Sequence, residues 1–196
     1  MNRKVCVLMG SPHPDGNTAS LLSPLVRRME KHGCAVTTFH LYDCDIRPCI
    51  ACRACQTDWE RPNCCQCDGM QEIFDAVLSS DLLILATPIF SWYCTPPMKA
   101  ALDRMVYALC KYYCGKRGPS LLTGKKLALL STCGYRPENG SDLWETGMQR
   151  YCRHTQMQYC GAIAERHLGY DIPFMDDGKA ERAEAFADRL VQLISK

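Results

Sequence analysis

The sequence lacks several features, and each absence excludes a class of protein. No apolar run approaches the length that a membrane-spanning helix needs. The apolar run near the N-terminus ends at Gly10, which is too short for a secretory signal peptide. The chain also lacks an internal repeat and a low-complexity linker. We therefore expect a cytoplasmic protein without a membrane partner, with residues 1–196 in a single domain.

An excess of charge is missing as well. The formal net charge is +2 at neutral pH, and the pI is about 7.9. Basic side chains are not clustered as they are in proteins that bind nucleic acid, so we expect no nucleic-acid partner. Hydrophobic residues make up 47% of the chain and charged residues 22%, a balance that suits a compact domain with a buried core.

Cysteine, by contrast, is abundant. The chain has fifteen cysteines. Because glutathione and thioredoxin keep cytoplasmic thiols reduced, we do not expect these residues to be mainly disulfides. Their distribution along the chain must have another explanation.

Strand and helix patterns alternate along the chain. Apolar or β-branched runs predict strands at residues 4–9, 35–41, 82–87, 126–132 and 158–164. Apolar residues at helical spacing predict helices at residues 17–31, 70–78, 97–109, 142–155 and 181–194. Pro24 lies inside the first helix, where it should cost about 3 kcal/mol, bend the helix or delay its start. The alternation predicts a flavodoxin-like three-layer sandwich, with a five-stranded parallel sheet of order 2-1-3-4-5 and helices on both faces.

The polar segment after the first strand has the composition of a phosphate site. Ser11, Asn17 and Thr18 are short hydrogen-bond donors beside Gly10 and Gly16. The free amides and positive dipole end of the helix that follows favour an anion. A well-capped turn without a ligand is the alternative interpretation.

The loop after the third strand is rich in aromatic residues. It carries Phe90, Trp92 and Tyr93 among prolines and short hydroxyl side chains. In a doubly wound sheet this loop converges with the loops after the first and fourth strands, and its rings suit a flat aromatic ligand. The loop at residues 132–135 would then close the pocket. A contact between subunits is the alternative role for Trp92 and Tyr93.

These motifs together resemble the flavodoxin-like NAD(P)H-dependent FMN reductases over roughly residues 4–135. The matching residues are Gly10-Ser11-Pro12, Gly16-Asn17-Thr18, Thr87-Pro88-Ile89-Phe90, and Lys99 with Asp103-Arg104. The resemblance implies FMN as the cofactor, with its phosphate bound by Ser11, His13, Asn17, Thr18 and Ala19. The isoalloxazine would be lined by Pro88, Ile89, Phe90, Ser91 and Trp92, with Thr132 and Gly134 closing the pocket. Members of the family often carry Arg where this chain has His13, so we expect weaker phosphate binding, or binding that varies with pH near neutrality.

The same resemblance implies an enzyme without a catalytic acid, base or nucleophile of its own. Hydride would pass from NAD(P)H to flavin N5, and electrons would then pass to a small acceptor such as a quinone, a nitro or azo aromatic, a flavin or a metal complex. A homodimer or homotetramer is also implied. We expect Asp103-Arg104 to be a structural ion pair or a subunit contact, Cys94 and Cys133 to be buried packing residues, and His32, His40, His154 and His167 to be structural or solvated.

A cysteine-rich insertion at about residues 44–68 separates the second strand from its helix. Cys49, Cys52 and Cys55 have the spacing with which bacterial ferredoxins begin an iron–sulfur ligand run. Within the flavodoxin-like group this placement resembles the iron–sulfur flavoproteins, which implies a [4Fe–4S] cluster with Cys65 as the fourth ligand. Zinc held by four thiolates, or a loop of reduced thiols at a subunit contact, are the alternatives.

Two other functions fit the sequence less well. A flavodoxin-type or iron–sulfur flavoprotein electron carrier would serve a protein partner and usually has an acidic docking surface, which the near-neutral charge disfavours. A metal-binding or interaction module, in which the sheet only supports the cysteine loop, is the third hypothesis.

Overall fold

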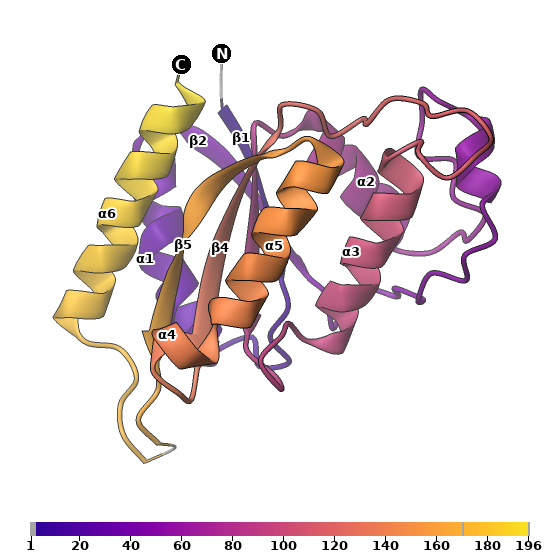
Figure 1. The fold of residues 1–196 in the computed structure, drawn as a ribbon. Coiled ribbons are helices and arrows are strands. Elements are labelled where there is room, and N and C mark those ends of the chain that lie inside the picture. Colours follow the sequence, from indigo (N-terminus) through magenta and orange to yellow (C-terminus); the bar gives the residue numbers. More distant parts are fainter. Residues whose placement is uncertain (1–2, 170, 196) are drawn as a thin grey trace.

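A computed structural model describes residues 3–169 and 171–195 of the chain. Its centre is a five-stranded parallel sheet in the order β2-β1-β3-β4-β5 (Figure 1). The strands are β1 (Arg3–Met9), β2 (Cys34–His40), β3 (Leu82–Pro88), β4 (Lys126–Cys133) and β5 (Gln158–Arg166). The flavodoxin-like fold and its strand order, predicted from the alternation of apolar patterns, are confirmed.

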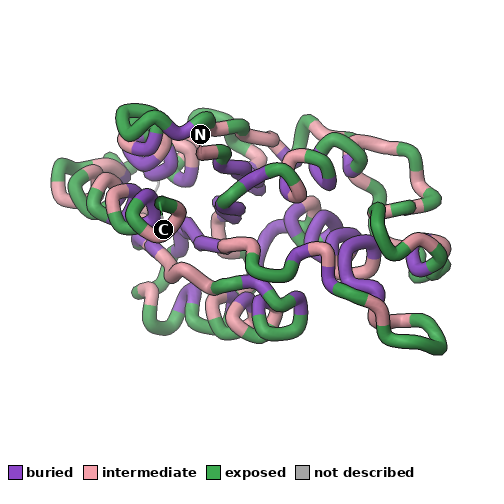
Figure 2. The backbone as a smooth tube through the Cα atoms, turned by 90° about the horizontal axis from the view of Figure 1, so that it is seen from above, coloured by how far each residue is buried: buried purple, intermediate pink, exposed green. Residues whose placement is uncertain are grey.

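Helices cover both faces of this sheet. Helices α1 (Asn17–Lys31) and α6 (Asp177–Ile194) pack on one face, and α2 (Met70–Ser79), α3 (Pro96–Leu109) and α5 (Asp142–Thr155) pack on the other (Figure 1). Two short helical turns, η1 (Ala54–Thr57) and α4 (Pro137–Gly140), complete the described elements. Because both faces of the sheet are covered, β3 is almost entirely buried, as its unbroken apolar run predicts. The buried backbone lies in the middle of the molecule in Figure 2, between exposed outer loops.

The register of the sheet brings three loops to one edge. Met9 at the end of β1 pairs with Ala86 of β3, and Pro88 at the end of β3 pairs with Thr132 of β4. All three strands run in the same direction, so the loops that follow them start side by side. This edge is where open α/β sheets bind ligands.

Two helices differ from the sequence-based expectation. Helix α1 runs unbroken from Asn17 to Lys31 although it contains Pro24, which is buried on the side of the helix that faces the sheet and α6. Burial of that apolar face is the physical reason that the helix persists. Helix α6 begins at Asp177 rather than at residue 181, because the side chain of Asp176 accepts a hydrogen bond from the Lys179 amide at 2.8 Å and caps the first turn.

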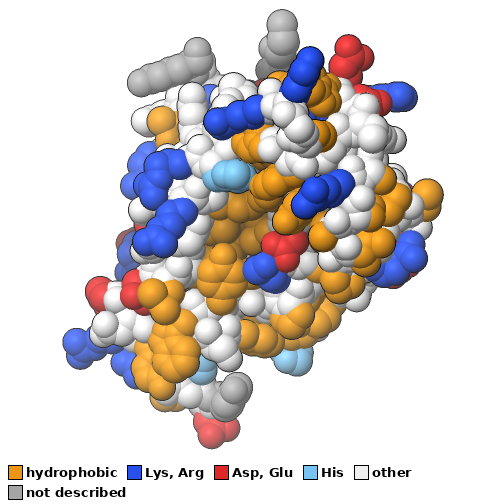
Figure 3. All heavy atoms as spheres, turned by 45° about the vertical axis from the view of Figure 1, so that its right-hand side comes forward, with side chains coloured by type: hydrophobic (Ala, Val, Ile, Leu, Met, Phe, Trp, Pro, Cys, Tyr) orange, Lys and Arg blue, Asp and Glu red, His pale blue; other side chains and the backbone are white. Residues whose placement is uncertain are grey.

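The cysteine insertion lies outside the three layers. The chain between β2 and α2 projects beyond one end of the molecule and contains η1 (Figure 1). Across the described residues, the helices are too short or too polar to span a bilayer. Figure 3 turns the side of the molecule that carries the insertion toward the viewer. This face has a broad band of hydrophobic side chains with basic side chains around it.

Candidate functional site

Three buried hydroxyl groups lie where the loops meet. The Thr18 and Thr132 hydroxyls share a hydrogen bond of 2.8 Å, and both side chains are almost fully buried. The Ser11 hydroxyl accepts a hydrogen bond from the His13 amide at 3.1 Å, which closes the turn after β1. These contacts order the polar loop before a ligand arrives, and such preorganisation lowers the entropy cost of binding.

The N-terminus of α1 faces the same region. Asn17 is the first helical residue and Gly16 precedes it; along the described chain no side chain caps this end of the helix, and its first turn has no acidic residue. The first amides of a helix have no intrahelical partner, and the helix dipole adds a partial positive charge there. Backbone and side-chain donors of this turn are therefore available to an anion.

The Thr95 side chain connects the segment after β3 to the loop after β1. Its hydroxyl donates a hydrogen bond to the Gly10 carbonyl at 2.7 Å. A Cβ atom on Gly10 would lie only 2.9 Å from that hydroxyl oxygen, so the close approach of the two loops requires glycine at this position.

The aromatic loop after β3 is held in a strained conformation. Phe90 and Tyr93 exchange backbone hydrogen bonds of 2.8 and 3.0 Å, and Ser91 and Trp92 between them have φ angles of 49° and 63°. Non-glycine residues rarely adopt this left-handed region, and such strain gathers at functional sites. The Trp92 ring stacks on Tyr135 with centroids 5.9 Å apart, so the loops after β3 and β4 form one wall.

The three loops enclose a cavity of about 600 Å³, which is within the range of cofactor sites. Ten of the predicted cofactor residues line it: Ser11, His13, Asn17, Thr18, Pro88, Ile89, Phe90, Ser91, Thr132 and Gly134. Trp92 lines an adjoining depression of about 380 Å³ together with Tyr135. Ala19 follows on the first turn of α1, outside the set of lining residues.

Four further residues line this cavity: Pro12, Gly16, Cys133 and His167. His167, which we expected from the sequence to be structural or solvated, lines both the cavity and the adjoining depression. It follows β5 directly, and its amide donates a hydrogen bond to the Cys133 carbonyl at 3.0 Å. Cys133 also lines the cavity, and burial raises the pKa of its thiol. Cys94 is buried as expected, and burial raises its pKa to about 12.

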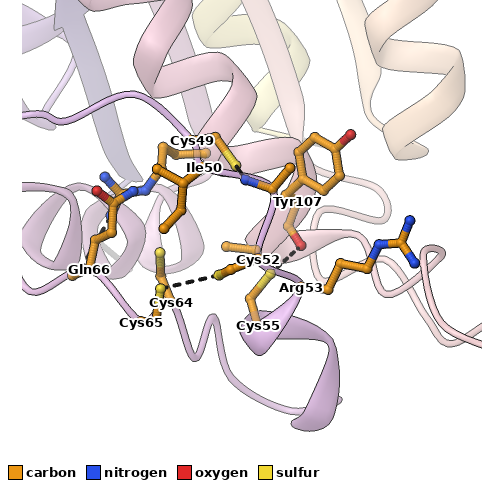
Figure 4. Close-up of a pocket in the computed structure, with 12 residues that line it drawn as sticks. Cys49, Ile50, Cys52, Arg53, Cys55, Cys64, Cys65, Gln66 and Tyr107 are labelled. Atoms are coloured by element: carbon orange, nitrogen blue, oxygen red, sulfur yellow. Dashed lines mark hydrogen bonds between the residues drawn. The ribbon is translucent and has the colours of Figure 1, made fainter.

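The four predicted metal ligands share a second, much smaller cavity. Cys49, Cys52, Cys55 and Cys65 line a space of about 20 Å³, which Cys64 also lines (Figure 4). Within the described ranges, however, no group of three or more His, Cys, Asp or Glu side chains is arranged to hold a metal ion. The topology has nonetheless gathered the four predicted ligands around one space.

Two of these thiols are in direct contact. The Cys52 and Cys65 sulfur atoms lie 3.2 Å apart (Figure 4). Hydrogen bonds from the Ala54 amide and from the Cys65 thiol lower the pKa of Cys52, whereas the contact with Cys52 and partial burial raise the pKa of Cys65. Cys55 behaves differently, because its thiol is buried and donates to the Tyr107 carbonyl at 3.0 Å.

A buried ion pair fixes the C-terminal part of the insertion. Arg104 on α3 binds Asp68 through both terminal nitrogens, at 2.8 and 3.0 Å, and both side chains are almost completely buried. Burial alone would raise the pKa of Asp68, but hydrogen bonds from Arg104 and from the Arg47 and Met70 amides outweigh it and hold the pKa at about 2. Asp103 and Arg104 do not pair with each other as expected, since Asp103 instead binds Lys99 at 2.6 Å. Their other expected role, a subunit contact, stays a prediction.

A buried ammonium fixes the rest of the insertion. Lys111 has no exposed surface, and its Nζ donates to the carbonyls of Cys55 at 2.8 Å and Arg61 at 2.7 Å. Burial lowers the pKa of Lys111. The Gln56 side chain adds a hydrogen bond to the Cys110 carbonyl at 3.1 Å. Helix α3 and the residues that follow it therefore hold the insertion through buried polar contacts, which were not evident from the sequence.

The sequence relationships agree with this geometry. Residues 3–142 match the family of NADPH-dependent FMN reductases, and the chain belongs to that family. An iron–sulfur flavoprotein of Archaeoglobus fulgidus is 32% identical over 120 residues, which cover 61% of this chain and 53% of that protein. The resemblance inferred from the motifs is thus confirmed. The chain spans about half the length of the first two such relatives that it matches.

Solved structures support the fold. An FMN-dependent NADH-azoreductase from Bacillus anthracis, in complex with FMN, superposes with a TM-score of 0.67 at 14% identity, covering 97% of this chain and 99% of the azoreductase. An archaeal flavodoxin superposes with a TM-score of 0.60 at 12% identity, covering 99% of each chain. At these identities the likeness concerns the fold alone.

Proposed function

We propose that the protein is an FMN-dependent oxidoreductase that passes electrons from NAD(P)H to a small acceptor. The observation that carries the proposal is the cavity at the edge of the sheet, where a buried hydroxyl cluster and a helix N-terminus lie opposite an aromatic loop. A ligand with an anionic group at one end and a flat ring system at the other matches both the helix N-terminus and the aromatic loop. Membership of the reductase family favours FMN as that ligand.

The lining residues fit this cofactor. Ser11, Asn17 and Thr18 would bind the phosphate together with amides of the first turn of α1, including that of Ala19, and His13 would add a further donor. Residues 88–91 would lie along the ring system, with Thr132 and Gly134 at its other side. Phe90 is 46% exposed, so bound FMN would cover apolar surface.

In this proposal FMN supplies the redox chemistry, accepting hydride from the nicotinamide and passing electrons on. The protein binds and orients the reactants and supplies hydrogen bonds to the ring from the backbone of its loops. No side chain is assigned as a catalytic acid, base or nucleophile. His167 would contact the ligand region beside Gly134, where a Cβ atom would lie 3.3 Å from its Nε2.

In this proposal the acceptor binds in the adjoining depression. This depression shares Ile89, Ser91 and His167 with the main cavity and is walled by the stacked rings of Trp92 and Tyr135. This wall suits a planar acceptor such as a quinone or an azo or nitro aromatic.

Anaerobic reduction tests the proposal. The purified protein should be yellow and should lose its absorbance near 450 nm when NADH or NADPH is added without oxygen, then regain it when 1,4-benzoquinone is added. A colourless protein that does not take up FMN would refute the proposal, as would a yellow protein that neither nucleotide reduces.

An electron carrier is the second candidate, because the insertion gathers cysteines on an exposed projection and a relative carries the name iron–sulfur flavoprotein. A carrier would be reduced by a partner protein and not by NAD(P)H. The [4Fe–4S] cluster on Cys49, Cys52, Cys55 and Cys65 stays a prediction, and no step is derived through it.

We also propose a homodimer or homotetramer. Trp92 and Tyr135 are 48% and 61% exposed at the mouth of the site, and aromatic side chains are enriched in protein interfaces. Light scattering of the FMN-bound protein measures the mass directly, and a monomer at micromolar concentration would contradict this part of the proposal.

A further inference from the structure

The insertion places two exposed thiols in direct contact. Cys52 and Cys65 are thirteen residues apart in the sequence, and their sulfur atoms lie 3.2 Å apart. Both residues are exposed to solvent. A disulfide has an S–S length of about 2.05 Å, so the sulfurs have to approach by a further ~1.1 Å to form a bond.

The backbone around Cys52 is held in an unusual conformation. Ala51 and Arg53, its two neighbours, have φ angles of 54° and 62°. Neither residue is glycine, so both are in the sparsely populated left-handed region. Strain of this kind persists only where the surrounding structure enforces it, and here it fixes the direction of the segment that carries Cys52.

Each thiol belongs to a segment that is anchored to α3 or to the residues that follow it. On the Cys52 side, the Gln56 side chain donates to the Tyr107 carbonyl at 2.5 Å, and Lys111 donates to the Cys55 carbonyl at 2.8 Å. On the Cys65 side, Arg104 binds Asp68 in the buried ion pair. Two reactive groups that the same part of the fold holds in place react as though at high local concentration.

The neighbouring thiols are less suited to the same reaction. Cys55 is buried, and its thiol donates to a backbone carbonyl. Cys49 accepts a hydrogen bond from the Ala51 amide at 3.4 Å. Cys67 is exposed like Cys65 and lies two residues from it, which makes it a matched control.

We propose that Cys52 and Cys65 form a reversible disulfide, a covalent redox site distinct from the flavin cavity. With a hydroperoxide as the oxidant, one thiolate sulfur bonds to a peroxide oxygen and the O–O bond breaks, which gives a sulfenic acid. The other oxygen leaves as an alcohol or, from hydrogen peroxide, as water. The second thiol attacks that sulfur and releases water. With hydrogen peroxide the balance is two thiols and one peroxide to one disulfide and two waters, and an external dithiol reverses the reaction by exchange.

The disulfide has a consequence for metal binding by the insertion. A sulfur atom in a disulfide is no longer a thiolate, and the thiolate is the form that binds metal. Oxidation of this pair and coordination of a metal by Cys52 and Cys65 therefore exclude each other.

Peptide mapping tests the proposal on the full chain. The protein, purified without air and with its metal content measured, is treated with one equivalent of hydrogen peroxide, alkylated and digested without reductant. We expect the Cys52–Cys65 linked peptide to be at least about tenfold more abundant than any other pairing, because proximity favours it strongly. Dithiothreitol should release it, and bound FMN should be unchanged by either treatment.

Two cysteine variants test whether the linkage is specific to Cys52 and Cys65. Cys67→Ser should keep the linkage, whereas Cys65→Ser should abolish it and leave Cys52 as a sulfenic acid that dimedone traps. The proposal is overturned if Cys52 pairs equally with Cys64 or Cys67. It is also overturned if no linkage forms, including the case in which bound iron or zinc protects both thiols from peroxide.

Discussion

The Thr18 and Thr132 hydroxyls lie 2.8 Å apart, although 114 residues separate them in the sequence. Thr18 lies in the first turn of α1, and Thr132 is close to the end of β4, so this one hydrogen bond joins the start of α1 to the end of β4. Thr18→Val keeps the shape of the side chain and removes the hydroxyl. We expect the FMN dissociation constant to rise about tenfold and the free energy of unfolding to fall by about 1 kcal/mol.

Fluorescence titration with FMN and urea unfolding measure these two effects. Thr37→Val, on an exposed position of β2, is the matched control and should change neither. An FMN affinity in Thr18→Val equal to that of the unmodified protein would contradict the assignment of Thr18 to the site.

Asn17 allows a test of whether a negatively charged phosphate binds at the end of the cavity formed by the start of α1. Asn17→Asp places a carboxylate where the phosphate is proposed to bind, and two like charges repel. We expect FMN affinity to fall by more than about tenfold. Asn17→Ala removes the amide without adding charge and should lose less affinity, so equal losses in the two variants would show that the phosphate is bound elsewhere.

Trp92 allows acceptor binding to be tested separately from cofactor binding. It lines the adjoining depression but not the main cavity. Trp92→Ala should therefore raise the KM for 1,4-benzoquinone several-fold, with loss of ring stacking worth about 1 kcal/mol, while FMN affinity stays within about twofold. Trp59→Ala, on the exposed insertion, is the control. A loss of FMN binding in Trp92→Ala would show that the ring belongs to the cofactor site itself.

Asp68 tests whether the insertion is held by the buried ion pair. Asp68→Asn leaves the Arg104 guanidinium buried without its carboxylate, which should lower the free energy of unfolding by about 3 kcal/mol or more. The pKa of Asp68 is held at about 2, below its value of about 3.9 in unfolded chains. Its contribution is therefore present in full above about pH 4 and is lost as the pH falls toward 2.

Urea unfolding at pH 7 and at pH 3 measures this dependence. The unmodified protein should lose more stability between these two pH values than Asp68→Asn does. Asp75→Asn, on the exposed side of α2, is the control. An Asp68→Asn variant that unfolds at the same urea concentration as the control would contradict the role of the pair.

The strands and most helices were predictable because burial imposes a period on the sequence. The apolar run at residues 82–87 corresponds to β3, and helical spacing predicts α2, α3 and α5 to within a residue or two. The start of α6 was missed because it depends on a cap at Asp176, which the apolar pattern does not record. Pro24 was expected to disturb α1, but the packing of its buried face outweighs the local cost.

The candidate site was predictable for a topological reason. Parallel strands end at the same edge of a sheet, so polar or aromatic loops after β1, β3 and β4 must meet there. His167 was missed because the fifth strand was expected to end at residue 164, whereas β5 runs to Arg166 and places His167 at that edge. The contacts of Arg104 and Lys111 with the insertion join segments that have no periodic pattern, so nothing in the sequence indicated them.

The central claim is that the cavity at the edge of the sheet binds FMN through its phosphate. Equilibrium titration of the flavin-free protein with FMN, and in parallel with riboflavin, tests it most directly because riboflavin has the ring system without the phosphate. The account predicts one FMN per chain, with riboflavin bound at least about 100-fold more weakly. Equal affinity for the two flavins, or no binding of either, would contradict it.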